Sequence, residues 1–328
     1  WAEKAPFVYG NRYSYEGLNT KEEVAGYGKL TWQFAPKWSL FADVQFRHVG
    51  YKANKYKVDE SLNSFNPKAG LTFFLNEHND LYVSYARATK EPNRSDYKSY
   101  YEALQDDPNA KKPIAEKLND IELGWRLTTP KVRLNLNGYY MAYQDQLVLS
   151  GKLNSTGYPI RENVGKSYRA GVEADAMVQL SERWFWSPNL AFSKNLNRDY
   201  KSQDADVATR TISWGDTRIS YSPDVVLGNT ITFIPIDGFQ IGLISKYVGA
   251  QYVDNTERDE AKLDAYFVNN LSLQYEWKPK STFKSVLFSV MGNNIFNTKY
   301  TPYGDNGYGM VYIPAAEANY LAGVTLSF

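Results

Sequence analysis

The stretch Leu40-Phe41-Ala42-Asp43-Val44-Gln45-Phe46-Arg47 alternates apolar and polar side chains over consecutive positions. A β-strand sends successive side chains to opposite faces, so this stretch predicts a strand with one apolar face and one charged face. An α-helix would instead spread the same residues around its circumference. The alternation therefore decides the fold class, which we predict to be all-β.

The same alternation recurs in about thirteen segments of roughly 9 to 13 residues. That length suits a tilted strand that crosses a bilayer, and it exceeds the roughly five or six residues of an average soluble strand. The segments centre on residues 24–34, 39–49, 69–75, 80–88, 118–127, 132–143, 168–180, 184–193, 225–234, 239–248, 266–277, 285–294 and 320–328. We therefore predict a transmembrane antiparallel β-barrel.

The connections between these segments alternate in length. Short links such as 35–37, 128–131 and 181–183 alternate with long polar links such as 89–116 and 194–222. Short periplasmic turns and long extracellular loops are typical of outer-membrane barrels, which in bacteria have an even number of strands. On this layout the first segment and the last both descend to the periplasm. We therefore expect residues 1–328 to be the C-terminal part of one larger barrel domain, with 1–21 as the remnant of an extracellular loop.

Composition narrows the classes of function. Lys and Arg number 37 against 36 Asp and Glu, and they form no basic block, which argues against a nucleic-acid partner. Cysteine is absent, and His48 and His78 are the two histidines, so thiolate chemistry and most histidine chemistry are excluded. The spacing of acidic residues matches no metal-binding motif. We predict no enzymatic activity, no catalytic residues, no metal site and no cofactor.

Charged residues recur on the polar face of the predicted strands. Such residues are costly in a membrane unless they face water or a partner, so we predict that they face the lumen. Two interpretations remain open: they guide a ligand and a moving plug, or they form a static network between barrel and plug. The lumen-facing candidates are Asp43, Gln45, Arg47, Asp120, Glu122, Arg126, Arg133, Glu173 and Asp175.

Aromatic and arginine side chains gather in the long links. Aromatic rings give large contact area at low entropic cost, and Arg binds carboxylate or catecholate groups, so these residues are ligand-binding candidates. The alternative is that the aromatic rings pack on each other and order the loops. The candidates are Arg94, Tyr97, Tyr100, Tyr101, Trp214, Arg218, Tyr303, Tyr308 and Tyr312.

Residues 81–93, which read LYVSYARATKEPN, resemble a segment of TonB-dependent outer-membrane receptors. Residues 116–124, 167–175, 292–300 and 321–328 extend the resemblance in the same order. The resemblance implies a barrel of about 22 strands with an N-terminal plug domain in its lumen. This chain would then supply the last thirteen strands, without the plug, the TonB box or the early strands. It also implies the outer membrane of a Gram-negative bacterium and the TonB–ExbB–ExbD complex as a partner.

These observations lead to one functional hypothesis and two alternatives. The hypothesis is a receptor that binds a scarce ligand through extracellular loops and imports it with TonB-derived energy. A ferric siderophore is the first expectation, followed by haem or cobalamin. The alternatives are a passive porin or glycan importer of the same barrel class and, more distantly, a soluble β-rich binding module. Expected partners are the protein's own plug, lipopolysaccharide and outer-membrane lipid, and a small-molecule metal chelate.

Overall fold

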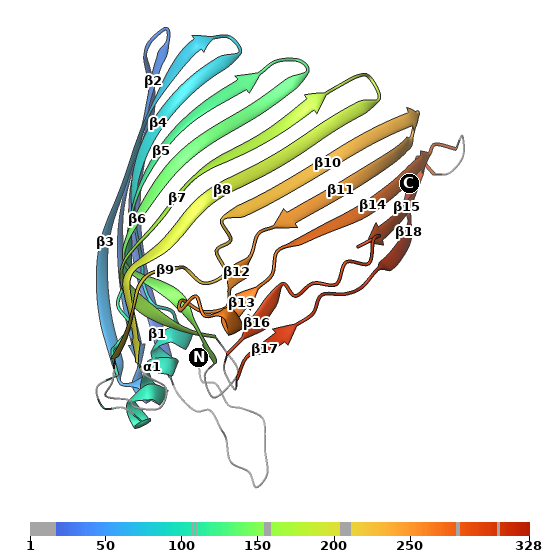
Figure 1. The fold of residues 1–328 in the computed structure, drawn as a ribbon. Helices are drawn as coiled ribbons and strands as arrows, with labels where there is room; N and C mark the ends of the chain where they lie inside the picture. Colours follow the sequence, from blue (N-terminus) through green and yellow to red (C-terminus); the bar gives the residue numbers. More distant parts are fainter. Residues whose placement is uncertain are drawn as a thin grey trace.

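A single curved antiparallel sheet dominates the computed structural model, which describes residues 18–106, 108, 110–153, 159–203, 211–279, 283–306 and 309–328. Thirteen strands follow one another along this sheet, and Figure 1 shows them leaning in the same direction. They are β1 (Asn19–Ala35), β2 (Trp38–Ala53), β3 (Val58–Asn76), β4 (Asn79–Lys90), β5 (Glu116–Thr128), β6 (Val132–Leu153), β7 (Pro159–Gln179), β8 (Trp184–Gln203), β10 (Val225–Ile236), β11 (Phe239–Val248), β14 (Tyr266–Trp277), β15 (Ser285–Asn293) and β18 (Asn319–Ser327). Each matches one predicted segment, which confirms the all-β prediction.

Strand register gathers the apolar side chains on one face of the sheet. One row runs from Phe73 through Leu81, Trp125 and Leu136 to Ala174, each residue directly opposite the next. Because side chains alternate along each strand, a shared register keeps every such row on the same face. Within the described residues these strands form one sheet, without the second facing layer of a sandwich. The apolar face is therefore an outer surface, as a membrane barrel requires.

The opposite face is polar, and register places all nine lumen-facing candidates on it. Arg126 Nε lies 2.7 Å from Asp80 Oδ1, and Asn135 Nδ2 donates to Asp175 Oδ2 at 2.9 Å. Gly124 lies under the ring of Tyr82, where an added Cβ would approach Tyr82 Cε1 to 2.2 Å. A glycine is needed at that position because the aromatic ring occupies the space of a side chain.

The long links are more ordered than the sequence indicated, which is a correction to the prediction of loops. They contain η1 (Asn54–Tyr56), α1 (Arg94–Asp106), β9 (Thr211–Arg218), β12 (Gln251–Tyr252), η2 (Asp259–Ala261), β13 (Lys262–Leu263), β16 (Tyr303–Asp305) and β17 (Val311–Ile313). The link at 144–167 is largely a continuation of β6 and β7, whose residues stay in register up to the Leu149–Arg161 pair. Strands continue there because Val148 and Val164 are buried against Tyr200 and its neighbours.

Short connections lie at one end of the sheet, and α1 with the small strands lies at the other (Figure 1). Within the described residues β1 pairs with β2 alone and β18 with β15 alone, so the two edge strands do not close a barrel with each other. β1 begins at Asn19, so residues 19–21 of the expected loop remnant belong to a strand, while residues 1–17 lie outside the described part. No helix in the described ranges has the length and apolar character needed to cross a membrane.

Candidate functional site

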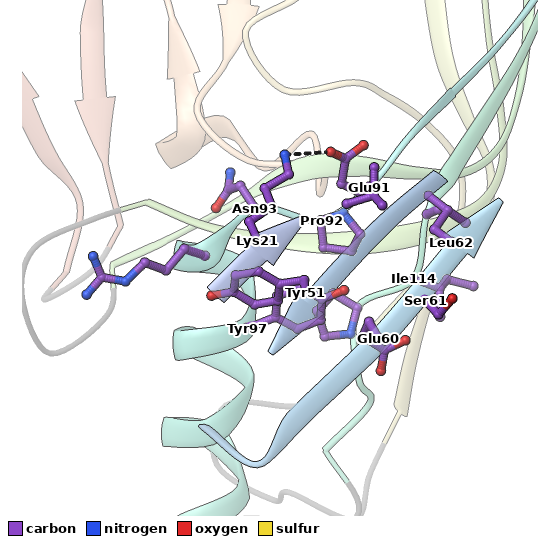
Figure 2. A pocket seen from close by; sticks show the side chains of 14 residues that line it. Lys21, Tyr51, Glu60, Ser61, Leu62, Glu91, Pro92, Asn93, Tyr97 and Ile114 are labelled. Atoms are coloured by element: carbon purple, nitrogen blue, oxygen red, sulfur yellow. Dashed lines mark hydrogen bonds and ion pairs between the residues drawn. The ribbon is translucent and has the colours of Figure 1, made fainter. Parts of the chain in front are cut away.

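A cavity of about 400 Å³ lies at the loop end of the sheet. Its walls come from the ends of β2 and β3, the start of α1 and residues 113–115. Figure 2 shows Tyr51 and Tyr97 side by side, with Lys21 and Glu91 above them and Glu60 below. Tyr51, Glu60 and Lys21 share the parity of the polar face, because register places Tyr51 opposite both of the other two. The cavity therefore opens on the polar side of the sheet.

Helix α1 begins at the cavity, and a reciprocal cap fixes its first turn. Asp96 N donates to Asn93 Oδ1 at 3.1 Å, and Asn93 N donates to Asp96 Oδ2 at 2.7 Å. This exchange is the capping box, which satisfies backbone donors that have no partner within the helix. Asp96 is buried, and burial raises the pKa of its carboxyl. Arg161 on β7 lies 3.8 Å from Asp96 and ties the helix to the extended β6–β7 hairpin.

An aromatic stack forms the wall between α1 and the sheet. The rings of Tyr51 and Tyr97 have centroids 5.3 Å apart and planes inclined by 16°. Tyr97 is 4% exposed and packs in a cluster with Ala53, Tyr56 and Val58. Burial raises the pKa of the Tyr97 hydroxyl, so it stays protonated at any physiological pH. The wall thus combines a large apolar surface with the neutral hydroxyl of Tyr97.

Residues 113–115, which form one wall of the cavity, are held by the side-chain amide of Asn163. Asn163 Oδ1 accepts from Ile114 N at 2.9 Å, and Asn163 Nδ2 donates to Ile114 O at 3.0 Å. Both polar groups of the Ile114 backbone are therefore satisfied by a single side chain on β7. This contact holds the wall at 113–115 against the extended hairpin.

An ion-pair cluster supports the rim of the cavity. Arg47 Nε and Nη2 lie 2.8 and 2.9 Å from the two carboxylate oxygens of Glu23. The same guanidinium contacts Glu91 with Nη1 at 2.6 Å and Nη2 at 2.8 Å. Lys21 Nζ lies 3.0 Å from Glu91 Oε1, and Figure 2 marks this pair. Two bidentate carboxylates around one planar guanidinium form a strong and directional arrangement.

The electrostatics of this cluster keep Glu91 ionised. The hydrogen bonds from Arg47, followed by lesser contributions that include Lys21, lower the pKa of Glu91 to about 2, and desolvation opposes them. A fixed negative charge therefore stands at the rim beside the cation of Lys21. The lining also includes Arg94 and Glu60, so the cavity presents both signs of charge around an apolar floor.

The predicted ligand-binding residues lie in three groups, one in each of three long links. Arg94 and Tyr97 line the cavity, whereas Tyr100 and Tyr101 lie further along α1, where the ring of Tyr101 contacts Tyr56. These residues belong to a helix and not to the predicted loop. For Tyr97 and Tyr101 the observed packing matches the alternative in which aromatic residues order the link.

The second group lies on β9. Trp214 Nε1 donates to Ser202 Oγ at 3.0 Å, and its ring packs against the buried cluster that contains Tyr200 and Ile219. Arg218 Nε lies 3.3 Å from Asp224, and its Nη1 lies 3.6 Å from Glu257. Both candidates are thus engaged in contacts within the protein.

The third group lies on the β16–β17 hairpin. The ring of Tyr303 stacks on Tyr221 with centroids 5.5 Å apart, and the hydroxyl of Tyr312 donates to the carbonyl of Glu260. Tyr308 lies outside the described residues. The hairpin is therefore held to the neighbouring links by its aromatic residues.

Sequence reasoning missed several residues of the cavity and its rim, namely Lys21, Glu23, Tyr51, Glu60 and Glu91. A signal for Glu23 was available, because the short turn between Ala35 and Trp38 sets a register that puts Glu23 opposite Val49 and diagonal to Arg47. Glu91 follows the last residue of β4, and no strand pattern indicates which cation it meets. Sequence reasoning also missed Asp80, which forms the ion pair with Arg126.

Comparison with known proteins gives a consistent result. Residues 4–295 match the family described as TonB dependent receptor-like, beta-barrel. The pesticin receptor of Yersinia enterocolitica is 24% identical over 303 residues, which cover 88% of this chain and 41% of that protein. The chain thus spans less than half the length of this relative.

Solved structures share the fold. The closed form of the ferric-catecholate import receptor Fiu from K12 E. coli has a TM-score of 0.72 at 17% identity, covering 98% of this chain and 47% of that one. The ferric yersiniabactin uptake receptor FyuA from Yersinia pestis has a TM-score of 0.70 at 20% identity, covering 94% and 45%. Identities this low establish a common fold alone.

Proposed function

The chain belongs to the TonB-dependent receptor-like β-barrel family, and on that premise we propose that it forms part of an outer-membrane receptor that imports a scarce metal chelate. The observation that carries this proposal is the cavity on the polar side of the sheet, at the end where the links are long. A volume of about 400 Å³ falls within the range of small-molecule sites, which is about 300–1,000 Å³. An aromatic wall and a charged rim suit a ligand that is partly planar and partly ionic.

A ferric siderophore is the proposed cargo class. Two of the similar solved structures are named as receptors for ferric catecholate and ferric yersiniabactin, and these names support iron chelates as a group without selecting one. The stacked Tyr51 and Tyr97 offer a surface for an aromatic chelating group. Lys21 and Arg94 offer cations for the negative charge that many ferric chelates carry.

We also propose that these strands are the C-terminal part of a larger barrel that encloses a plug. Two observations support this: the edge strands β1 and β18 do not pair with each other, and the relative named above is more than twice as long as the matched region. A closed barrel leaves no free edge in the bilayer, so further strands must complete the wall. Coupling to the TonB–ExbB–ExbD complex belongs to the same proposal.

The test is uptake of radiolabelled iron by cells that express the full-length protein. Ferric catecholate, ferric citrate and a ferric phenolate chelate are supplied separately, with and without a proton-gradient uncoupler. We expect one class of chelate to be taken up, and the uncoupler to abolish that uptake. Uptake that persists without the gradient would favour the passive porin, and uptake of oligosaccharide in place of iron would favour the glycan importer.

A further inference from the structure

Basic side chains replace apolar ones on the outer face of β4–β8, close to the loop end. The apolar rows end at a row that holds Tyr85, Ile121 and Tyr140 in register. At that level and beyond it the same face carries Arg87, Lys117, Lys166, Lys194 and Arg198, all of them exposed. The term outer basic patch refers here to these five residues. Along these strands the side chains on the outer face therefore change from apolar to cationic toward the loop end.

Register fixes how the outer basic patch is arranged. Lys117 lies opposite Gln144, which lies opposite Lys166, which lies opposite Arg198, so three cations share one row. Lys194 belongs to the row of Tyr140. Arg87 belongs to the row that lies between the Tyr140 row and the Lys117 row. Since neighbouring strands are about 4.8 Å apart, the backbones of Lys117 and Lys166 are separated by about 10 Å.

Little within the protein compensates this charge. Arg198 pairs with Asp216, and its guanidinium lies 4.9 Å from the ring centroid of Tyr168. In the described part of the chain the other four cations form no ion pair. Like charges directly opposite each other, as Lys166 and Arg198 are, destabilise a sheet unless an anion lies between them.

A hollow lies within the outer basic patch. It has a volume of about 270 Å³, and its lining includes Asn119, Tyr140, Lys166, Tyr168 and Arg198. Tyr85 donates its hydroxyl to Asn119 at 2.8 Å, and the rings of Tyr140 and Tyr168 stack with centroids 5.8 Å apart. Ordered aromatic rings thus form the side of the hollow toward the apolar rows, and cations form the opposite side.

We infer that the outer basic patch binds the phosphorylated headgroup of lipopolysaccharide in the outer leaflet. The inference rests on the proposed function, because it requires the apolar face to be in an outer membrane. A lipid phosphate in the hollow would neutralise Lys166, whose neighbour Arg198 already pairs with Asp216, while the acyl chains would continue down the apolar rows. Tyr140 and Tyr168 lie at the junction, where amphipathic rings are favoured. A freely dissolved anion would contact the cations alone, whereas a lipid would also contact the adjoining apolar surface.

The test uses the full-length protein purified in detergent and fluorescent, bisphosphorylated lipid A as the probe. In the variant Lys117→Gln/Lys166→Gln we expect affinity to fall about 30-fold, which corresponds to about 2 kcal/mol. The matched control is Lys68→Gln/Lys246→Gln, which removes two exposed strand lysines from the polar face. This control is expected to bind lipid A as the unaltered protein does, and phosphate-free lipid A is expected to bind weakly to all three.

Equal loss in both double variants, or no loss in either, overturns the inference. Equal binding of phosphate-free lipid A by the unaltered protein overturns it as well, and full competition by inorganic phosphate at constant ionic strength would assign the site to free anions. Flotation of the unaltered protein with phosphatidylethanolamine vesicles is measured in parallel. Failure to float refutes the outer-membrane proposal itself, whereas flotation without phosphate-dependent binding refutes the lipid site alone.

Discussion

At the scale of single residues, Arg47 organises the rim of the cavity. Its guanidinium contacts Glu23 and Glu91 from two different strand ends, and its side chain is 19% exposed. Two carboxylates brought this close repel each other unless the cation between them is present. The arrangement therefore holds the end of β4, and the link that follows it, against β1 and β2.

Protonation of Glu91 should weaken this end of the protein. Its pKa is lowered from 4.5 to about 2 in the folded protein, so the carboxylate contributes stability that is fully present above about pH 4.5 and is lost as the pH falls toward 2. We expect Glu91→Gln to reduce the free energy of unfolding at pH 7 by on the order of 2 kcal/mol. The difference from the unaltered protein should shrink as the pH approaches 2.

Urea unfolding of the full-length protein in detergent, repeated between pH 7 and pH 2.5, measures this difference. Glu22→Gln is the matched control, because Glu22 is an exposed neighbour of Glu23 whose side chain lies on the opposite face. Its effect at pH 7 should be small. A Glu91→Gln deficit that stays constant over the whole range would show that the carboxylate charge is not what stabilises the rim.

At the scale of elements, the docking of α1 should depend on one aromatic residue. Tyr97 is buried in the cluster that joins the helix to the end of β2 and the start of β3. We expect Tyr97→Ala to cost about 3 kcal/mol in local stability, since truncating a buried ring leaves a cavity. Hydrogen exchange across residues 94–106 should accelerate, and chelate binding should weaken. Tyr97→Phe keeps the ring and should behave nearly as the unaltered protein.

The half-buried Tyr100 supplies the comparison on the same helix. Tyr100→Ala should leave the exchange rates of α1 close to those of the unaltered protein. If the two alanine variants accelerate exchange equally, the helix is held by something other than the Tyr51–Tyr97 stack.

The sequence predicted elements well wherever one face of a strand meets lipid and the other meets water. Residues 266–277 were predicted and observed as one strand, and apolar and polar residues alternate regularly from Asn270 to Trp277. The strand predicted at 132–143 continues to Leu153, since its far end is buried by neighbouring links and loses the alternating pattern. Helix α1 escaped prediction because a capping box and tertiary packing hold it, while its exposed face reads as a polar loop.

The candidate site was predictable to a smaller extent. Arg47 was assigned to the polar face from parity alone, and register places it there. Its partner Glu91 is 44 positions away and lies beyond the end of a strand, so strand periodicity does not indicate the contact. Cavity walls made by links depend on long-range packing, which a local pattern does not encode.

At the scale of the whole molecule, the two faces of the sheet suit two different solvents, lipid on one side and water on the other. Rows of apolar side chains cross β1–β18 in register on one face, while ion pairs and amide hydrogen bonds occupy the other. Leu123 on the apolar face is 64% exposed, and many other large apolar side chains are exposed on the same face. A continuous apolar surface of this kind would be unfavourable in water. A bilayer removes that penalty and introduces a different one, because it excludes charge from the apolar face.

Leu123→Arg should therefore destabilise the protein in phosphatidylcholine vesicles by about 2 to 4 kcal/mol, the cost of an arginine near the bilayer midplane. Glu122→Arg changes the adjacent residue on the polar face, beside Asp120, and should cost far less because the new cation faces water and a carboxylate. Urea unfolding in vesicles of two acyl-chain lengths measures both variants. The Leu123→Arg deficit should vary with bilayer thickness, and the Glu122→Arg result should not. Equal costs for the two substitutions would mean that these faces do not divide lipid from water.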